Sequence, residues 1–133
     1  MNILFIEDDN IETMKLQRTV SKLQTKHNIT EAKNGEEALG ILNSDADLPD
    51  IILLDLNMPK MSGIEFLKIL KADNVMKYLP TIILTTSENR SDLLECYKIG
   101  IAGYILKPLK YEDYESKIRK VFEYWEANEI VKA

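Results

Sequence analysis

The sequence predicts an α/β domain in which a five-stranded parallel sheet is covered by helices on both faces. Short apolar runs alternate with amphipathic segments along the whole chain, and the run at 51–54 contains no polar residue. A strand without a polar face must be covered on both sides, which is typical of the centre of a parallel sheet. Strands and helices that alternate in this way are joined by right-handed crossovers, so we expect one doubly wound domain.

The composition excludes several classes of protein. The 133 residues can bury one core, and 22 acidic against 17 basic residues give a net charge of −5 without a concentrated basic face for nucleic acid. The single cysteine, Cys96, excludes an internal disulfide. The first residues do not resemble a signal peptide, and no apolar run approaches the roughly 20 residues that cross a bilayer. We therefore expect a cytoplasmic protein that binds neither nucleic acid nor membranes.

The first strand and helix follow directly from the pattern near the start of the chain. Residues 3–6 are wholly apolar and end at Glu7. From Ile11 onwards apolar residues recur at helical intervals among charged ones, which predicts a helix with Asp9 or Asn10 as its N-cap.

The next three elements are a strand, a helix and a strand. The strand at 29–32 is weakly predicted, and the Asn-Gly turn at 34–35 closes it and opens a short helix with apolar residues at 38–42. The apolar run at 51–54 is the clearest strand of the chain and ends at Asp55.

The second half of the chain predicts two further strands and three further helices. A loop with proline and glycine, residues 56–63, precedes them. The apolar residues of the two strands lie at 82–84 and 103–106. Those of the three helices lie at 64–70, 93–97 and 111–125.

Each of the four clear apolar runs is followed directly by a polar or charged residue that could belong to a site, whereas the weaker strand at 29–32 is followed by Lys33 and Asn34, which indicate an ordinary turn. The residues that follow the four clear runs are Glu7 and Asp8, Asp55, Thr85, and Lys107. Ligands of open parallel sheets bind beyond the carboxyl ends of the strands, so we expect these residues to converge. Three acids in one place repel one another unless a cation lies among them, and carboxylates suit Mg²⁺. With a lysine and a hydroxyl beside the metal, the constellation suits a phosphoryl group.

Each of these residues also has a purely structural explanation. A carboxylate after a strand is often a helix cap, a lysine is most often a surface residue, and a threonine often just ends a strand. Asp55 is the hardest to explain in this way, because it adjoins four buried apolar residues. The joint occurrence of all of them is what indicates a site.

Across nearly its full length the chain resembles the receiver domain of two-component response regulators, including the chemotaxis regulators. The resemblance rests on Glu7-Asp8, the stretch from Leu54 to Pro59, Gly63, Thr85, Gly103-Tyr104 and Lys107-Pro108. It implies a flavodoxin-like sheet of strand order 2-1-3-4-5. The receiver would span residues 1–128, leaving 129–133 as a tail without an effector domain. The run at 85–87 and the tryptophan of the last helix also resemble the single-domain regulators paired with bacterial phytochrome kinases.

The resemblance implies a role for each residue of the expected site. Asp55 would accept a phosphoryl group from a phosphohistidine on a sensor histidine kinase, and Lys107 and Thr85 would bind the phosphoryl oxygens. The implied ligands of Mg²⁺ or Mn²⁺ are Glu7, Asp8, Asp55 and the backbone carbonyl of Asn57. The protein would be a phosphoacceptor and not an enzyme, beyond phosphotransfer to itself and its own dephosphorylation.

The resemblance also implies how the signal would leave the site. Thr85 and the aromatic ring of Tyr104 would move together on phosphorylation and change the face formed by the fourth helix, fifth strand and fifth helix. Asn57 and Ser87 would tune the lifetime of the phosphoryl group, and the Lys107–Pro108 bond would be cis. A tyrosine that merely packs in the core is the alternative for Tyr104.

The last third of the chain carries seven of the ten aromatic residues and predicts an interface. Tyr124 and Trp125 are adjacent on a helix and cannot both face one core, so one of them should stand at the surface near Ile130 and Val131. An exposed aromatic and aliphatic patch suits a homodimer or a partner.

Two other functions compete with the phosphorylated switch. A pseudo-receiver adaptor usually lacks the acceptor, the lysine or the acid pair, and this chain has all of them. A Mg²⁺-dependent phosphohydrolase typically needs a second aspartate where Asn57 stands, and a cap region. His27, the only histidine, is a poor phosphorelay donor and is expected to be a solvated turn residue.

Overall fold

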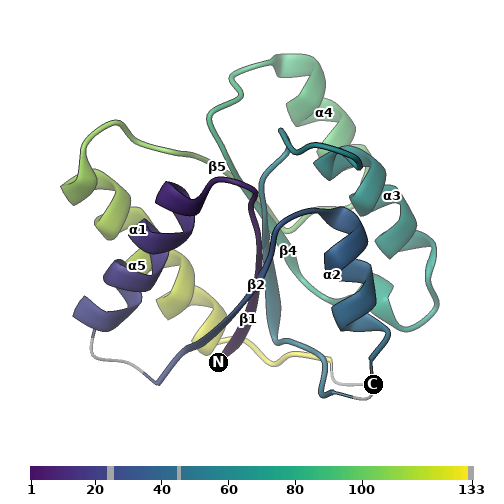
Figure 1. Ribbon diagram of the computed structural model, residues 1–133, viewed down its shortest axis with the longest axis horizontal. Coiled ribbons are helices and arrows are strands. Elements are labelled where there is room, and N and C mark those ends of the chain that lie inside the picture. The colour runs from purple at the N-terminus through teal and green to yellow at the C-terminus, as the bar shows by residue number, and fades with distance from the viewer. Residues whose placement is uncertain (24–25, 45, 132–133) are drawn as a thin grey trace.

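The computed structural model describes residues 1–23, 26–44 and 46–131, which form a parallel sheet between two layers of helices (Figure 1). Its strand order is β2-β1-β3-β4-β5. The strands are β1 (Asn2–Ile6), β2 (Asn28–Ala32), β3 (Ile51–Leu54), β4 (Thr81–Thr85) and β5 (Gly103–Leu106). The helices are α1 (Asn10–Lys22), α2 (Gly35–Leu42), α3 (Gly63–Ala72), the 3₁₀ turn η1 (Met76–Tyr78), α4 (Arg90–Ile99) and α5 (Tyr111–Glu126). The predicted fold class and strand order are confirmed, whereas η1 was not predicted.

Alternate residues of the central strands build two cores, one on each face of the sheet. Phe5 and Leu53 face α1 and α5 and pack with Tyr114 and Phe122, which are fully buried. Leu54 and its sheet neighbours Ile6 and Ile83 face α2, α3 and α4. Figure 1 shows the same division, with α1 and α5 on one side of the sheet and the other three helices opposite. β3 is buried along its whole length, as its apolar run predicts.

Side-chain caps fix where the helices begin. The Asp9 carboxylate accepts a hydrogen bond from the backbone N–H of Ile11 at 2.8 Å, which settles the N-cap of α1 in favour of Asp9 over Asn10. Asn34 caps α2 through the N–H of Glu37. Both caps lie at the carboxyl edge of the sheet, so they hold the first turns of these helices beside the strand ends.

Strand register continues one residue beyond β1 and β3 and brings their ends level. Ile6 pairs with Leu54, and the N–H of Asp55 donates to the carbonyl of Ile6 at 3.1 Å. On the other side of β1, the N–H of Glu7 donates to the carbonyl of Ala32 at 2.9 Å. Glu7 and Asp55 therefore lie side by side, each directly after the last residue of its strand.

Two expectations are wrong. No cis peptide bond occurs in the part of the chain that the structure describes, so the Lys107–Pro108 bond is trans. The trans form is intrinsically favoured at an X-Pro bond by about 0.5–1 kcal/mol, and here the trans loop delivers Lys107 to the edge of the sheet.

His27 is the second correction, because its side chain is only 2% exposed and is not solvated. Its Nδ1 lies 3.0 Å from the Met1 amino group, its Nε2 lies 2.9 Å from Glu126 Oε1, and its ring packs against Phe122. Burial and the amino-terminal charge lower the pKa of His27. The end of α5 covers this residue, and a contact across about 100 residues cannot be inferred from the turn's own sequence.

Candidate functional site

Three carboxylates lie together at the carboxyl edge of the sheet. Oxygens of Glu7, Asp8 and Asp55 lie within 4.8 Å of one another. Glu7 is 2% exposed and Asp55 is 6% exposed, whereas Asp8 faces solvent. This donor set of hard oxygen ligands, open on one side, suits a divalent cation that keeps part of its water shell.

Gly63 shapes the wall of this site behind Asp55. The N–H of Gly63 donates to the carbonyl of Leu56 at 3.0 Å, so α3 begins directly against the end of β3. A Cβ at Gly63 would lie 2.5 Å from the carbonyl oxygen of Asp55 and 2.7 Å from the Cα of Leu56, distances that side chains do not tolerate. The loop between Leu56 and Gly63 includes Asn57, which is exposed and lies two residues after Asp55 in the sequence. Only glycine permits this close approach.

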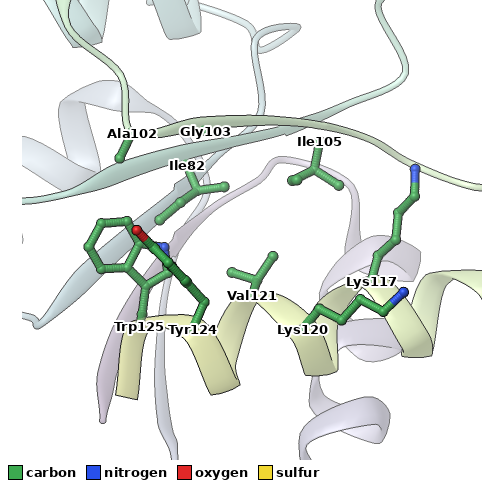
Figure 2. A pocket seen from close by; sticks show the side chains of 9 residues that line it. All are labelled: Ile82, Ala102, Gly103, Ile105, Lys117, Lys120, Val121, Tyr124 and Trp125. Carbon is green, nitrogen blue, oxygen red and sulfur yellow. The ribbon is translucent and has the colours of Figure 1, made fainter. Parts of the chain in front are cut away.

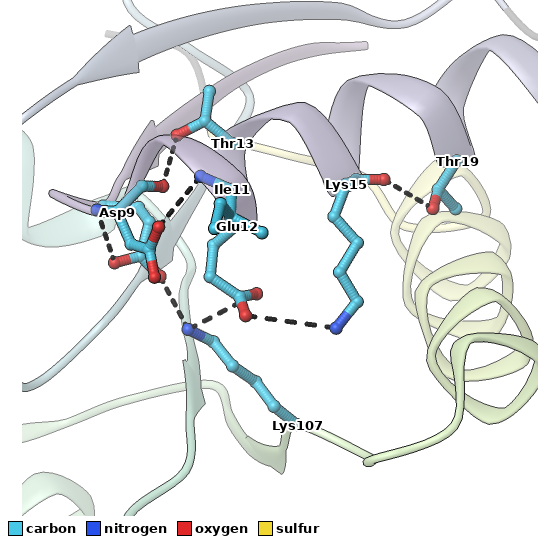
Figure 3. A network of polar contacts seen from close by, with 8 residues as sticks. Asp9, Ile11, Glu12, Thr13, Lys15, Thr19 and Lys107 are labelled. Carbon is cyan, nitrogen blue, oxygen red and sulfur yellow. Dashed lines mark hydrogen bonds and ion pairs between the residues drawn. The ribbon is translucent and has the colours of Figure 1, made fainter.

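Lys107 reaches the carboxylates from the end of β5. Its backbone N–H donates to the carbonyl of Thr85 at 2.8 Å, and its side chain is only 7% exposed. The Nζ donates to Glu7 Oε1 at 2.6 Å and lies 3.7 Å from Glu12 Oε2. Figure 3 shows the ammonium group of Lys107 facing Glu12 on the first turn of α1. A cation is therefore already held beside the candidate metal ligands.

Burial and the neighbouring charges shift the pKa values of both Glu7 and Lys107. Burial raises the pKa of Glu7 to about 7, the Asp55 carboxylate adds to the rise, and the hydrogen bond from Lys107 opposes it. Burial would lower the pKa of Lys107, but the hydrogen bond to Glu7 and the charges of Glu7, Asp55 and Glu12 together raise it. A divalent cation among these carboxylates would favour the ionised form of Glu7.

Thr85, Ser87 and Tyr104 form a second polar group that connects the edge of the sheet to α4. The buried Thr85 hydroxyl accepts from the N–H of Ser87 at 3.2 Å, and the Tyr104 hydroxyl donates to the Ser87 carbonyl at 3.0 Å. The Ser87 hydroxyl donates to Asp92 Oδ2 at 2.8 Å. Tyr104 is half-buried and its hydroxyl holds the loop after β4, so it does more than pack in the core.

The structure thus brings the predicted acids and Lys107 together at the edge where β4 ends in Thr85. Sequence reasoning missed Glu12, which contributes a further carboxylate to Lys107. A signal was present: with Asp9 as N-cap, Glu12 lies in the first helical turn, level with the strand ends. Which of the acids Lys107 would contact could not be inferred, because that depends on the path of the loop after β5.

A separate apolar groove of about 390 Å³ lies between β5 and α5 (Figure 2). Ile105, Val121 and Trp125 line it, and Lys117 and Lys120 stand at one end. Tyr124 is 62% exposed, whereas Trp125 is half-buried against the core. The prediction that one of these adjacent aromatic residues stands at the surface is confirmed.

None of the helices in the described residues is long and apolar enough to span a bilayer.

A parallel sheet of this order, with buried carboxylates and a paired lysine at its carboxyl edge, is a doubly wound α/β domain with a candidate cation site. Residues 3–119 match the family model of the response regulator receiver domain. The chemotaxis protein CheY-3 of Vibrio cholerae is 36% identical over 126 residues, covering 92% of each chain. The chain therefore belongs to the receiver domain family of two-component response regulators.

Solved structures agree with this assignment. The phosphorylated cyanobacterial phytochrome response regulator RcpA is 29% identical, with a TM-score of 0.89 over 95% of this chain and 94% of that chain. The Mn²⁺-bound form of response regulator Rcp1 is 26% identical, with a TM-score of 0.89 over 99% of each chain. Phytochrome response regulators are thus among the structural neighbours of this chain, as its sequence suggested.

Proposed function

We propose that the protein is a response regulator that accepts a phosphoryl group on Asp55 from a partner histidine kinase. The observation that carries this proposal is the position of a buried Asp55 among carboxylates that could hold a metal ion, with Lys107 beside them, in a receiver fold. In the transfer, an Asp55 Oδ–P bond forms while the P–N bond of the kinase phosphohistidine breaks. The electron pair of that bond returns to the imidazole of the kinase.

The donor set fits Mg²⁺, or Mn²⁺ in its place. Glu7, Asp8, Asp55 and the backbone carbonyl of Asn57 would hold the ion, and a Mn²⁺-bound relative supports this choice of cation. The ion would supply positive charge for the phosphoryl oxygens. Phosphoryl transfer depends mainly on positioning and on charge stabilisation, so the protein needs little further covalent machinery.

Lys107 and Thr85 would bind the phosphoryl oxygens directly. Lys107 is the one cation held against the carboxylates in the described part of the chain, and Thr85 ends the strand next to β3. Because Thr85 already contacts Ser87, and Tyr104 holds Ser87 through its carbonyl, a shift of the Thr85 hydroxyl would disturb both contacts. The α4-β5-α5 face would respond through these contacts, and Ser87 and Asn57 would tune the phosphoryl lifetime.

The partner is proposed to be a sensor histidine kinase of the phytochrome type. The likeness to the phytochrome response regulator RcpA supports this proposal. The receiver unit is proposed to span residues 1–128. The groove beside α5, with exposed Tyr124 at its rim, is a proposed homodimer surface.

Intact mass after incubation with acetyl phosphate tests the proposed function. We expect one phosphoryl adduct that needs Mg²⁺ and is absent from Asp55→Asn. The matched control is Asp47→Asn, which removes an exposed carboxylate between α2 and β3 and should leave the adduct unchanged. No adduct at any donor concentration would favour the pseudo-receiver function instead.

A further inference from the structure

We propose that Glu12 is a positioning residue that holds Lys107 away from the phosphoryl group and frees Glu7 to bind the metal. This inference rests on the proposed function of Asp55, and it assigns a role to a residue outside the expected site. Its basis is the contact between the first turn of α1 and the end of β5 (Figure 3).

The backbone of Glu12 is fixed by the N-cap of α1. Asp9 accepts from the N–H of Ile11 through its carboxylate, and its carbonyl accepts from the N–H of Thr13 at 3.1 Å and from the Thr13 hydroxyl at 3.2 Å. The residues that make these bonds, Ile11 and Thr13, flank Glu12 on both sides. The carboxylate is thus carried on an anchored helical turn.

The Glu12 carboxylate is directed at Lys107. Its Oε2 is buried, lies 3.7 Å from Lys107 Nζ and makes no hydrogen bond with any residue that the structure describes. Its Oε1 lies 4.0 Å from Lys15 Nζ, at the limit of an ion pair. A buried carboxylate oxygen without a hydrogen bond is costly, so Lys107 is the group positioned to compensate it.

Glu7 has two competing partners. It accepts the 2.6 Å hydrogen bond from Lys107, and it is also a member of the carboxylate cluster that would hold the metal. When Glu7 turns to a metal ion, Lys107 loses its nearest carboxylate. Glu12 then provides the remaining one on the same side.

Two effects of opposite sign follow for Glu12→Gln. Without the second carboxylate, Lys107 holds Glu7 more strongly and repels the ion more, so metal affinity should fall about two- to threefold. Once the metal is saturating, Lys107 has lost its alternative partner and is available to the phosphoryl group. The rate of phosphorylation should then rise about three- to tenfold.

The test uses Glu12→Gln, the charge-conserving Glu12→Asp, and Glu36→Gln as a control for loss of an exposed acid on the first turn of α2. Affinity is measured by titration calorimetry with Mg²⁺ alone. The phosphorylation rate is measured by intact mass with acetyl phosphate at saturating Mg²⁺. We expect weaker binding and faster phosphorylation in Glu12→Gln only, with Glu12→Asp restoring most of the wild-type behaviour.

Other outcomes overturn the proposal in recognisable ways. If Glu12→Gln lowers both affinity and rate, Glu12 is a structural residue. If it changes neither, the 3.7 Å contact has no function. If the wild type takes up no phosphoryl group, the proposed function fails. In that case an affinity equal in Glu12→Gln and wild type would also overturn the role of Glu12 in freeing Glu7.

Discussion

Lys107 donates a 2.6 Å hydrogen bond to Glu7, the buried acid that follows β1, although the two residues are 100 positions apart in the chain. The pair connects the two outer positions of the site, the end of β5 and the end of β1. Since Glu7 is also a candidate metal ligand, binding of an ion and release of Lys107 are expected to be coupled. As the metal enters, Lys107 would lose Glu7 and keep Glu12 as its remaining carboxylate partner.

Metal affinity should depend on pH through Glu7. Burial, aided by the charge of Asp55, raises the pKa of Glu7 to about 7, and the metal binds the ionised carboxylate. Mg²⁺ affinity should therefore be about tenfold weaker near pH 6 than near pH 8, and should level off above about pH 8. Calorimetric titrations across this range measure it. Glu7→Gln should bind more weakly and lose most of the dependence, whereas a wild-type affinity constant over the range would contradict the account.

Replacing Lys107 by methionine should destabilise the metal-free protein, and more so at higher pH. The buried Glu7 carboxylate would keep Asp55 as a neighbour but lose its cation. Because the pKa of Glu7 is raised in the folded state, the fold is favoured below the acid's ordinary pKa of 4.5 and loses that stability as pH rises through about 7.

The free energy of unfolding in Lys107→Met should fall by about 3 kcal/mol near pH 8, and by much less near pH 6. Urea denaturation at both pH values measures this. The control is Lys110→Met, which removes an exposed ammonium group just before α5 and should change stability little. An equal loss in Lys107→Met at the two pH values would show that packing, not charge, explains the effect.

Alanine at two helical glycines should have opposite effects. In Gly63→Ala the new Cβ meets the Asp55 carbonyl, so the start of α3 must move, at a cost of about 1–3 kcal/mol. In Gly40→Ala the Cβ meets nothing within 4 Å inside α2, and stability should rise by about 0.5–1 kcal/mol. Thermal unfolding of both variants is the measurement. A neutral Gly63→Ala would mean that the loop after β3 adapts without strain.

Tyr104→Phe should loosen the loop between β4 and α4. It removes the hydrogen bond to the Ser87 carbonyl, worth about 1 kcal/mol, and leaves the ring in place. Amide hydrogen exchange should become faster at residues 86–89 while β4 keeps its protection. Tyr97→Phe, which removes an exposed hydroxyl from α4, is the matched control and should exchange like the wild type. Unchanged exchange at 86–89 in Tyr104→Phe would show that the Tyr104 hydroxyl does not stabilise this loop.

The positions of the strand ends could be predicted from the sequence, but the contacts between the residues at those ends could not. The run at 51–54 has no polar residue, so its burial and the placement of Asp55 could be predicted from it alone. The pairing of Lys107 with Glu7 depends on how the loop after β5 crosses the sheet edge, and local patterns hold no information on that path. The burial of His27 beneath the end of α5 was missed for the same reason.

Gly63 illustrates an intermediate case. The sequence places Gly63 at the end of the predicted loop 56–63 and includes it in the resemblance to receiver domains. The physical requirement, a Cβ that would lie 2.5 Å from the carbonyl oxygen of Asp55, is visible only when α3 and β3 are placed together. The trans Lys107–Pro108 bond shows the reverse, since there the family expectation was wrong for this chain.

The most direct test of the account is to locate the phosphoryl group within the chain. After incubation with acetyl phosphate and Mg²⁺, borohydride reduction converts an aspartyl phosphate into homoserine, which peptide mass spectrometry places in the sequence. We predict homoserine at position 55 alone, dependent on Mg²⁺. Homoserine at Asp8 or at another aspartate, a reduced alcohol at a glutamate, or a phosphoryl group that resists borohydride would contradict the assignment of Asp55 as the acceptor.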